Sequence, residues 1–141
     1  MRFKNILYLF VLVAFGCKKP PEEPEEKKEL VMVETSEMAQ LMNEMYAYNE
    51  SIKQQIIDGK FNNSFPKKFM NIHSAVLTDP SDRDGSFESF SKLFLEAQKA
   101  VFESSNADLT TNYNKAINAC ISCHEVKCVG PIPRIKKLLI K

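Results

Sequence analysis

Several features are scarce or missing in this sequence, and each absence argues against a class of fold, partner or membrane topology. The chain has no tryptophan, four glycines and two histidines among its 141 residues. Its 19 basic and 18 acidic residues leave a formal net charge of +1, so nothing in the charge balance points to a nucleic-acid partner. Neither a strand-like alternation nor an internal repeat is visible. The apolar run from Ile6 to Phe15 is too short to predict a transmembrane span.

The cysteines do not fit a disulfide framework. Cys120, Cys123 and Cys128 fall within nine residues near the end of the chain, and Cys17 lies far upstream. Ten phenylalanines and six methionines, by contrast, are many for a chain of this length. They suit an apolar helical core or a core that lines a cofactor, and composition alone does not separate the two.

The first 29 residues have the organisation of an exported lipoprotein. Residues 1–16 resemble a bacterial signal peptide, with a basic start before the apolar run. Ala14-Phe15-Gly16-Cys17 resembles a lipobox, which predicts that Cys17 is acylated, although Phe15 is bulkier than usual and an ordinary secretory signal is the alternative. Residues 17–29 predict a flexible tether rich in Pro, Glu and Lys. We therefore expect a periplasmic or cell-surface lipoprotein anchored to a bacterial membrane.

Residues 30–128 predict an all-α domain. Apolar residues recur at spacings of three and four in residues 36–57, 67–77 and 86–104, and in a fourth segment that starts at Asn106 or Asp108. Four such helices joined by short loops predict an antiparallel four-helix bundle. We expect the basic and apolar tail, residues 129–141, to pack back along it. The predicted inward stripes are Met38, Leu41, Met42, Met45, Tyr48, Ile52 and Ile56; Phe69, Ile72, His73 and Val76; Phe87, Phe90, Phe94, Ala97 and Val101; and Leu109, Tyr113, Ile117, Cys120 and His124.

The stretch Cys120-Ile121-Ser122-Cys123-His124 is the motif around which the chain is organised. It reads C-x-x-C-H, the attachment signature of haem c. Cys120 and Cys123, one helical turn apart, can bond to the two vinyl groups on one edge of the porphyrin, and His124 can supply the proximal nitrogen to the iron. Bacteria attach this haem outside the cytoplasm, so an exported chain is a suitable context. The motif predicts one covalently attached haem c.

Two other interpretations use the same residues. A structural zinc ion could take Cys120, Cys123, His124 and Cys128, although adjacent helical side chains diverge by about 100°. A redox-active Cys-x-x-Cys pair is the second alternative, but no βαβ pattern surrounds it. Cys128 lies outside the haem motif and is either a free thiol or a group at the haem edge. His73 is either a core or rim histidine or a second axial ligand.

A four-helix bundle with C-x-x-C-H on its last helix resembles the cytochrome c-prime family and its low-spin, methionine-ligated relatives. The resemblance covers about residues 34–127. It implies that a methionine of the first helix is the sixth iron ligand. Met42 is favoured, because Leu41-Met42-Asn43-Glu44 resembles the ligand-bearing turn; Met38 and Met45 share that face, and core packing is the alternative for all three. Family members are often dimers through their first two helices, which leaves a homodimer open.

The chain departs from the family after the motif, where family members typically end. Arg134 in this tail could pair with a haem propionate, or be a solvated surface residue. No nucleophile, acid–base pair or second metal site is visible in the sequence, so we expect no enzyme. We expect electron transfer with a redox partner that the sequence does not identify. The alternatives are a five-coordinate haem protein that binds a small gas and a haem-free lipoprotein that binds a partner.

Overall fold

The computed structural model describes residues 34–62 and 64–141. The predicted signal peptide, the lipidation site at Cys17 and the tether lie outside the described residues. Within the described ranges every regular element is helical, which confirms the all-α prediction for this part of the chain. None of these described helices combines the length and the hydropathy that crossing a membrane would need.

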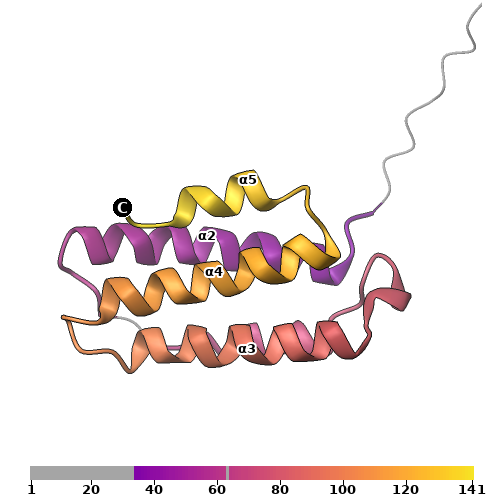
Figure 1. The fold of residues 1–141 in the computed structure, drawn as a ribbon, viewed down its shortest axis with the longest axis horizontal. Coiled ribbons are helices and arrows are strands. Elements are labelled where there is room, and N and C mark those ends of the chain that lie inside the picture. The colour runs from indigo at the N-terminus through magenta and orange to yellow at the C-terminus, as the bar shows by residue number, and fades with distance from the viewer. Residues whose placement is uncertain (1–33, 63) are drawn as a thin grey trace, which may run out of the picture. The chain divides into compact units, whose positions relative to one another are not determined.

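Three long α-helices form the frame of the fold. They are α2 (Glu37–Ile57), α3 (Gly85–Phe102) and α4 (Leu109–Lys127), and they lie side by side with roughly parallel axes (Figure 1). The chain between α2 and α3 returns along the length of the helices before α3 begins, so α2 and α3 point the same way (Figure 1). α4 runs opposite to both, and its main packing partner is α3.

Side-chain caps begin α2 and α3 at or next to the positions that the sequence predicted. Ser36 Oγ accepts a hydrogen bond at 3.2 Å from the N–H three residues further on, and α2 begins there. Gly59 follows the other end of α2 with a φ of 64°, a conformation that favours glycine. Asp84 caps α3, which starts one residue before its predicted position, and α4 begins after Asp108.

The second predicted helix, residues 67–77, is wrong as an α-helix. The structure has a 3₁₀ helix, η2 (Lys67–His73), followed by irregular chain. The Arg83 guanidinium donates to the carbonyl oxygen of His73 at 2.7 Å and to that of the residue two positions on at 2.6 Å, and so holds oxygens that a longer helix would use. As a result His73 and Val76 are exposed instead of buried. Where the sequence predicted four long α-helices, the described residues form three, and the 3₁₀ helix η2 stands in place of the second.

The predicted stripes of the three long helices supply most of a core in two adjoining clusters. A cluster of three buried polar side chains joins these helices. Gln98 Nε2 of α3 donates to Asn49 Oδ1 of α2 at 3.0 Å, and Tyr113 of α4 donates its hydroxyl to the Asn49 carbonyl oxygen at 2.9 Å. These bonds fix the register of the helices, because a shift of any one would leave a buried polar group unpaired.

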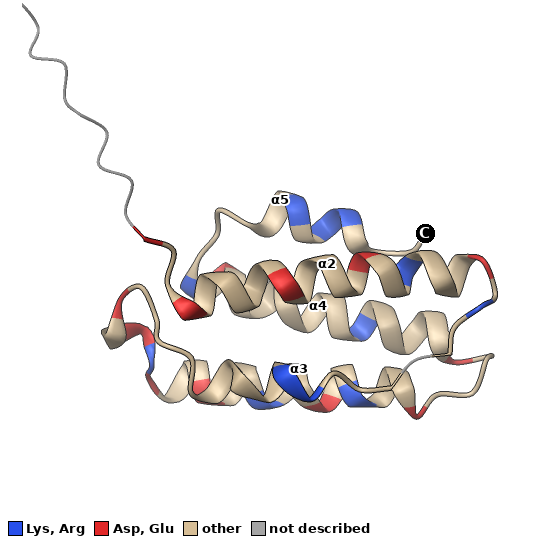
Figure 2. Ribbon diagram, turned by 180° about the vertical axis from the view of Figure 1, so that it is seen from behind, with Lys and Arg blue, Asp and Glu red and all other residues tan. Residues whose placement is uncertain are grey.

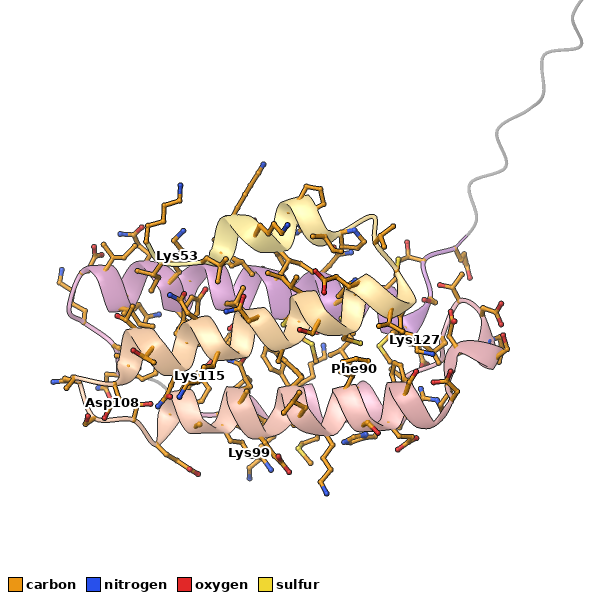
Figure 3. The ribbon with its side chains drawn as sticks, viewed as in Figure 1. Lys53, Phe90, Lys99, Asp108, Lys115 and Lys127 are labelled. Atoms are coloured by element: carbon orange, nitrogen blue, oxygen red, sulfur yellow. The ribbon has the colours of Figure 1, made fainter. Side chains whose placement is uncertain are left out.

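Residues 129–141, here termed the C-terminal strap, pack back along the helices as expected. The strap contains α5 (Ile132–Ile135) and η4 (Lys136–Leu138), and it covers α2 and α4 (Figure 1). Its own side chains Ile135 and Leu138 are buried. Three of its basic residues lie on α5 and η4, namely Arg134, Lys136 and Lys137 (Figure 2). Lys53 of α2, labelled in Figure 3, donates to the carbonyl oxygen of Lys137 at 2.7 Å.

Candidate functional site

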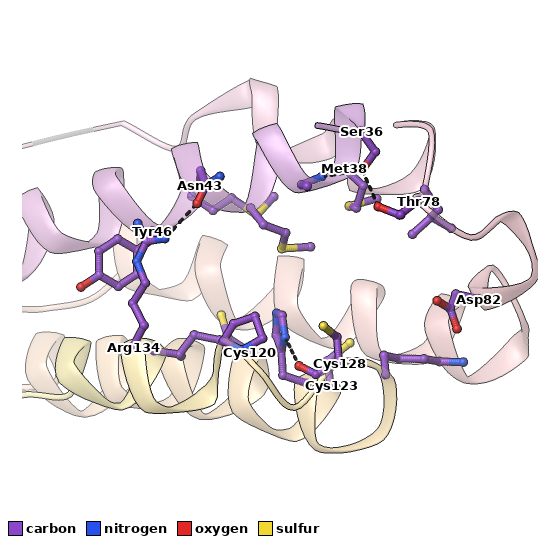
Figure 4. Close-up of a pocket in the computed structure, with 18 of the residues that line it drawn as sticks. Ser36, Met38, Asn43, Tyr46, Thr78, Asp82, Cys120, Cys123, Cys128 and Arg134 are labelled. Carbon is purple, nitrogen blue, oxygen red and sulfur yellow. Dashed lines mark hydrogen bonds between the residues drawn. The ribbon is translucent and has the colours of Figure 1, made fainter. Parts of the chain in front are cut away.

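A cavity of about 390 Å³ lies between α2, the end of α4 and the C-terminal strap. This volume is within the range of roughly 300–1,000 Å³ that is typical of cofactor and small-molecule sites. Figure 4 shows side chains of α2 on one side of the space and Cys120, Cys123 and Cys128 on the other. Of the residues predicted for the haem and its iron, the structure brings all except the alternative ligand His73 to this cavity: Met38, Met42, Met45, Cys120, Cys123, His124 and Arg134.

The motif occupies the C-terminal half of α4. Cys120 and His124 are four residues apart, so they share one face of the helix. Cys120, Cys123 and His124 are each half-buried, whereas Cys128 is exposed. The three cysteines of the described part carry free thiols. One helix therefore presents two thiols and an imidazole to the same space.

Burial keeps the two motif thiols protonated. It raises the pKa of Cys120 to about 12, and the neighbouring Cys123 adds to the effect. Burial also raises the pKa of Cys123, with Lys127 opposing it. A reactive Cys-x-x-Cys pair needs a lowered pKa, as at a helix N-terminus or beside a cation. The observed direction argues against the redox alternative.

The histidine of the motif is oriented by the backbone that follows it. His124 Nδ1 lies 2.9 Å from the carbonyl oxygen of Cys128. Because a carbonyl oxygen only accepts hydrogen bonds, Nδ1 carries the proton in this contact. Nε2 is then the nitrogen with a lone pair, and metal-binding histidines are commonly held in this way. The imidazole has the tautomer that a proximal ligand requires.

A zinc ion lacks its ligand set here. Among the described residues, no group of three or more His, Cys, Asp or Glu side chains converges to hold a metal ion. A structural zinc site needs four such ligands. A haem iron differs, because the porphyrin supplies four nitrogens and the protein only the axial ligands. The site residues fit a haem better than a zinc ion.

The three methionines of α2 differ in burial. Met38 and Met45 are each 6% exposed and belong to the core. Met42 is half-buried at the edge of that core. It lines the main cavity and an adjoining cavity of about 30 Å³, which also borders Cys120, Cys123 and His124. Met45 lines both cavities as well, so partial burial is the property that distinguishes Met42 from the other two.

Arg134 lines the cavity, whereas His73 lies outside it. Arg134 Nη1 donates to Asn43 Oδ1 at 2.9 Å, and the guanidinium carbon lies 3.8 Å from the ring centroid of Tyr46. Its pairing with a propionate stays a prediction. His73 is exposed, with Nδ1 3.4 Å from Ser91 Oγ, and it lines neither cavity. The structure does not bring this histidine to the motif.

Sequence reasoning missed two parts of the site. The loop before α3 closes one end of the cavity with Thr78 and Asp82, and Ser36 Oγ lies 2.9 Å from Thr78 Oγ1 (Figure 4). No local pattern marks a loop that closes a cavity. Lys127 also lines the cavity and forms an ion pair of 2.6 Å with Asp84 (Figure 3 labels Lys127 at the end of α4). Its position three residues after the histidine could have revealed it, because such residues share a helix face.

No protein-family model, curated protein or solved structure matches this chain. The resemblance to the cytochrome c-prime family therefore depends on the sequence alone: the predicted helix count, the position of the motif and the methionines of the first helix.

Proposed function

We propose that this protein is an exported monohaem c-type cytochrome that transfers electrons through a haem attached to α4. One observation carries the proposal: the C-x-x-C-H motif lines a cofactor-sized cavity with its imidazole held by Nδ1, and methionines of α2 border the same cavity. Thiols, imidazole and thioether are the groups that attach and ligate a c-type haem.

Each motif residue has a distinct role in this proposal. Cys120 and Cys123 would hold the haem through thioether bonds, since both are free thiols that line one cavity. His124 would bind the iron through Nε2, while the Cys128 carbonyl keeps the ring in place. Arg134 at the cavity rim has further N–H groups with which it could reach a propionate.

The sixth ligand decides the type of cytochrome. Met42 is our choice, because it combines a position on the cavity with incomplete burial. The haem supplies a one-electron Fe(III)/Fe(II) couple. If His124 on α4 and Met42 on α2 both held the iron in each oxidation state, electron transfer would need no ligand exchange. The buried side chains of Met38, Met45, Phe87, Ile135 and Leu138 would give a haem apolar walls to pack against.

The proposal includes a cellular location and a way for the domain to reach a redox partner. Acylation of Cys17 would anchor the protein at a bacterial membrane, in the periplasm or on the cell surface. The tether would let the domain approach a redox partner near that membrane. The proposed role is that of a carrier and not of an enzyme.

The mass and the visible spectrum of the full-length protein, exported by a bacterium that attaches haem c, test the proposal. We expect the mass increment of one haem and a low-spin spectrum in both oxidation states, with the charge-transfer band of methionine-ligated ferric iron. The double variant Cys120→Ser/Cys123→Ser is the control and should lack the covalent haem.

Each contrary result points to a different function. A mature wild-type protein without the haem increment would leave the haem-free, partner-binding lipoprotein. A haem-bearing protein with a high-spin ferric spectrum would favour the five-coordinate gas binder. Lipid labelling of the wild type, compared with Cys17→Ser, tests the anchor separately.

A further inference from the structure

The C-terminal strap connects the two sides of the cavity. It follows directly after Cys128, whose carbonyl oxygen orients His124. From there it crosses to α2, and Pro131, Arg134 and Leu138 line the cavity on the way. The strap therefore begins next to the residue that orients His124, and further along it contacts α2.

Arg134 makes the contact with α2 at the turn that carries Met42. Its Nη1 donates to Asn43 Oδ1 at 2.9 Å, across 91 positions of sequence. Its guanidinium lies over the ring of Tyr46, 3.8 Å from the centroid. Asn43 adjoins Met42 in sequence, and Tyr46 lies four residues after it on the same helix face. One side chain thus holds two neighbours of the proposed sixth ligand.

We propose that Arg134 is a positioning residue that keeps Met42 at the sixth position of the iron. This inference rests on the proposed function. The two axial ligands come from different helices, so movement of α2 relative to α4 changes the distance between them. Arg134 restricts this movement by tying the Met42 turn to the strap that begins beside His124. Without the tie, a larger share of molecules has Met42 detached, and an external ligand binds that open form.

The strap has other anchors, so the role of Arg134 can be separated from folding of the strap. Asn114 of α4 accepts from the Ile140 N–H at 2.9 Å and donates to the Ile140 carbonyl oxygen at 2.8 Å. Lys53 of α2 also holds the strap, and Ile135 and Leu138 are buried. An Arg134 variant therefore keeps the strap in place while it loses the link to the Met42 turn.

Imidazole titration of the ferric haem protein tests the inference, with loss of the methionine charge-transfer band as the signal. For Arg134→Ala we expect an apparent imidazole affinity about tenfold higher than in the wild type, because a hydrogen bond to a charged group and an exposed cation–π contact are lost together. Asn43→Ala should raise the affinity in part. The double variant should exceed Arg134→Ala very little, because both changes break the same contact.

Asn114→Ala is the matched control, since it loosens the far end of the strap. It should lower the melting temperature and leave the imidazole affinity unchanged. If the wild type shows the methionine band but Arg134→Ala and Asn43→Ala bind imidazole as the wild type does, the inference is overturned and the proposed function stands. If the wild type carries no haem, the proposed function itself fails. Should Arg134→Ala not accumulate, Asn43→Ala alone decides by the same criterion.

Discussion

Replacing each methionine of α2 by leucine and by alanine separates iron ligation from core packing. Leucine removes the thioether but nearly conserves side-chain volume, so each Leu variant should lose less than about 1.5 kcal/mol of packing stability. We expect Met42→Leu to lose the methionine charge-transfer band. Met38→Leu and Met45→Leu should keep it, because those two side chains are only 6% exposed and belong to the core.

The alanine variants measure packing at the same positions. The difference in unfolding free energy between the Leu and Ala variants at one position cancels any effect of ligation, since both lack the thioether. At Met38 and Met45 we expect about 2–5 kcal/mol, the usual cost of truncating a buried side chain. At Met42, which is half-buried, we expect roughly 1 kcal/mol, because less apolar surface is lost there.

Two assays on the haem-bearing protein give these values: the ferric visible spectrum for ligation and guanidinium unfolding for packing. The reasoning is refuted if Met45→Leu or Met38→Leu loses the band while Met42→Leu retains it. In that case a core methionine is the ligand, and partial burial is not the property that selects it. If all three variants retain the wild-type spectrum, the sixth ligand is not a methionine of α2.

Three further predictions follow from individual contacts. Among the three cysteines of the described residues, Cys128 should be the one that a maleimide labels in the haem-bearing protein, as it is exposed. In protein made without haem it should react first and Cys120 last, because burial raises the pKa of Cys120. The Lys127 ion pair and a backbone N–H lower the pKa of Asp84 from its ordinary value of 3.8, so Asp84 stabilises the fold above that pH and loses its effect as pH falls further. Asp84→Asn should thus lower the melting temperature at pH 7, and its difference from the wild type should shrink below about pH 3.8. Tyr113→Phe should cost about 1 kcal/mol in urea unfolding, since it removes a buried hydrogen bond, and an unchanged midpoint would contradict this.

The long helices were predictable because their signals are local. Ser36 and Gly59 mark the two ends of α2. The hydroxyl of Ser36 caps the first turn, and Gly59 adopts the left-handed backbone conformation that follows the last turn. The buried stripes follow the helical period, which is a property of consecutive residues. The second predicted helix failed where a distant side chain intervened: Arg83 binds the carbonyl oxygens at the end of η2, and no pattern within residues 67–77 announces that contact.

The candidate site also has one part that the sequence predicts and one part that only the tertiary structure shows. The sequence by itself determined that Cys120 and His124 share one face of one helix and that Cys123 lies one turn from Cys120, because motif spacing and helical period are local properties. Only the tertiary structure decided what surrounds that face. It left Met42 at the edge of the core while burying Met38 and Met45. It also turned the Cys128 carbonyl toward His124 and joined Arg134 to Asn43 across 91 positions. Such contacts depend on where separate helices and the strap pack, and packing has no signature in the spacing of residues along the chain.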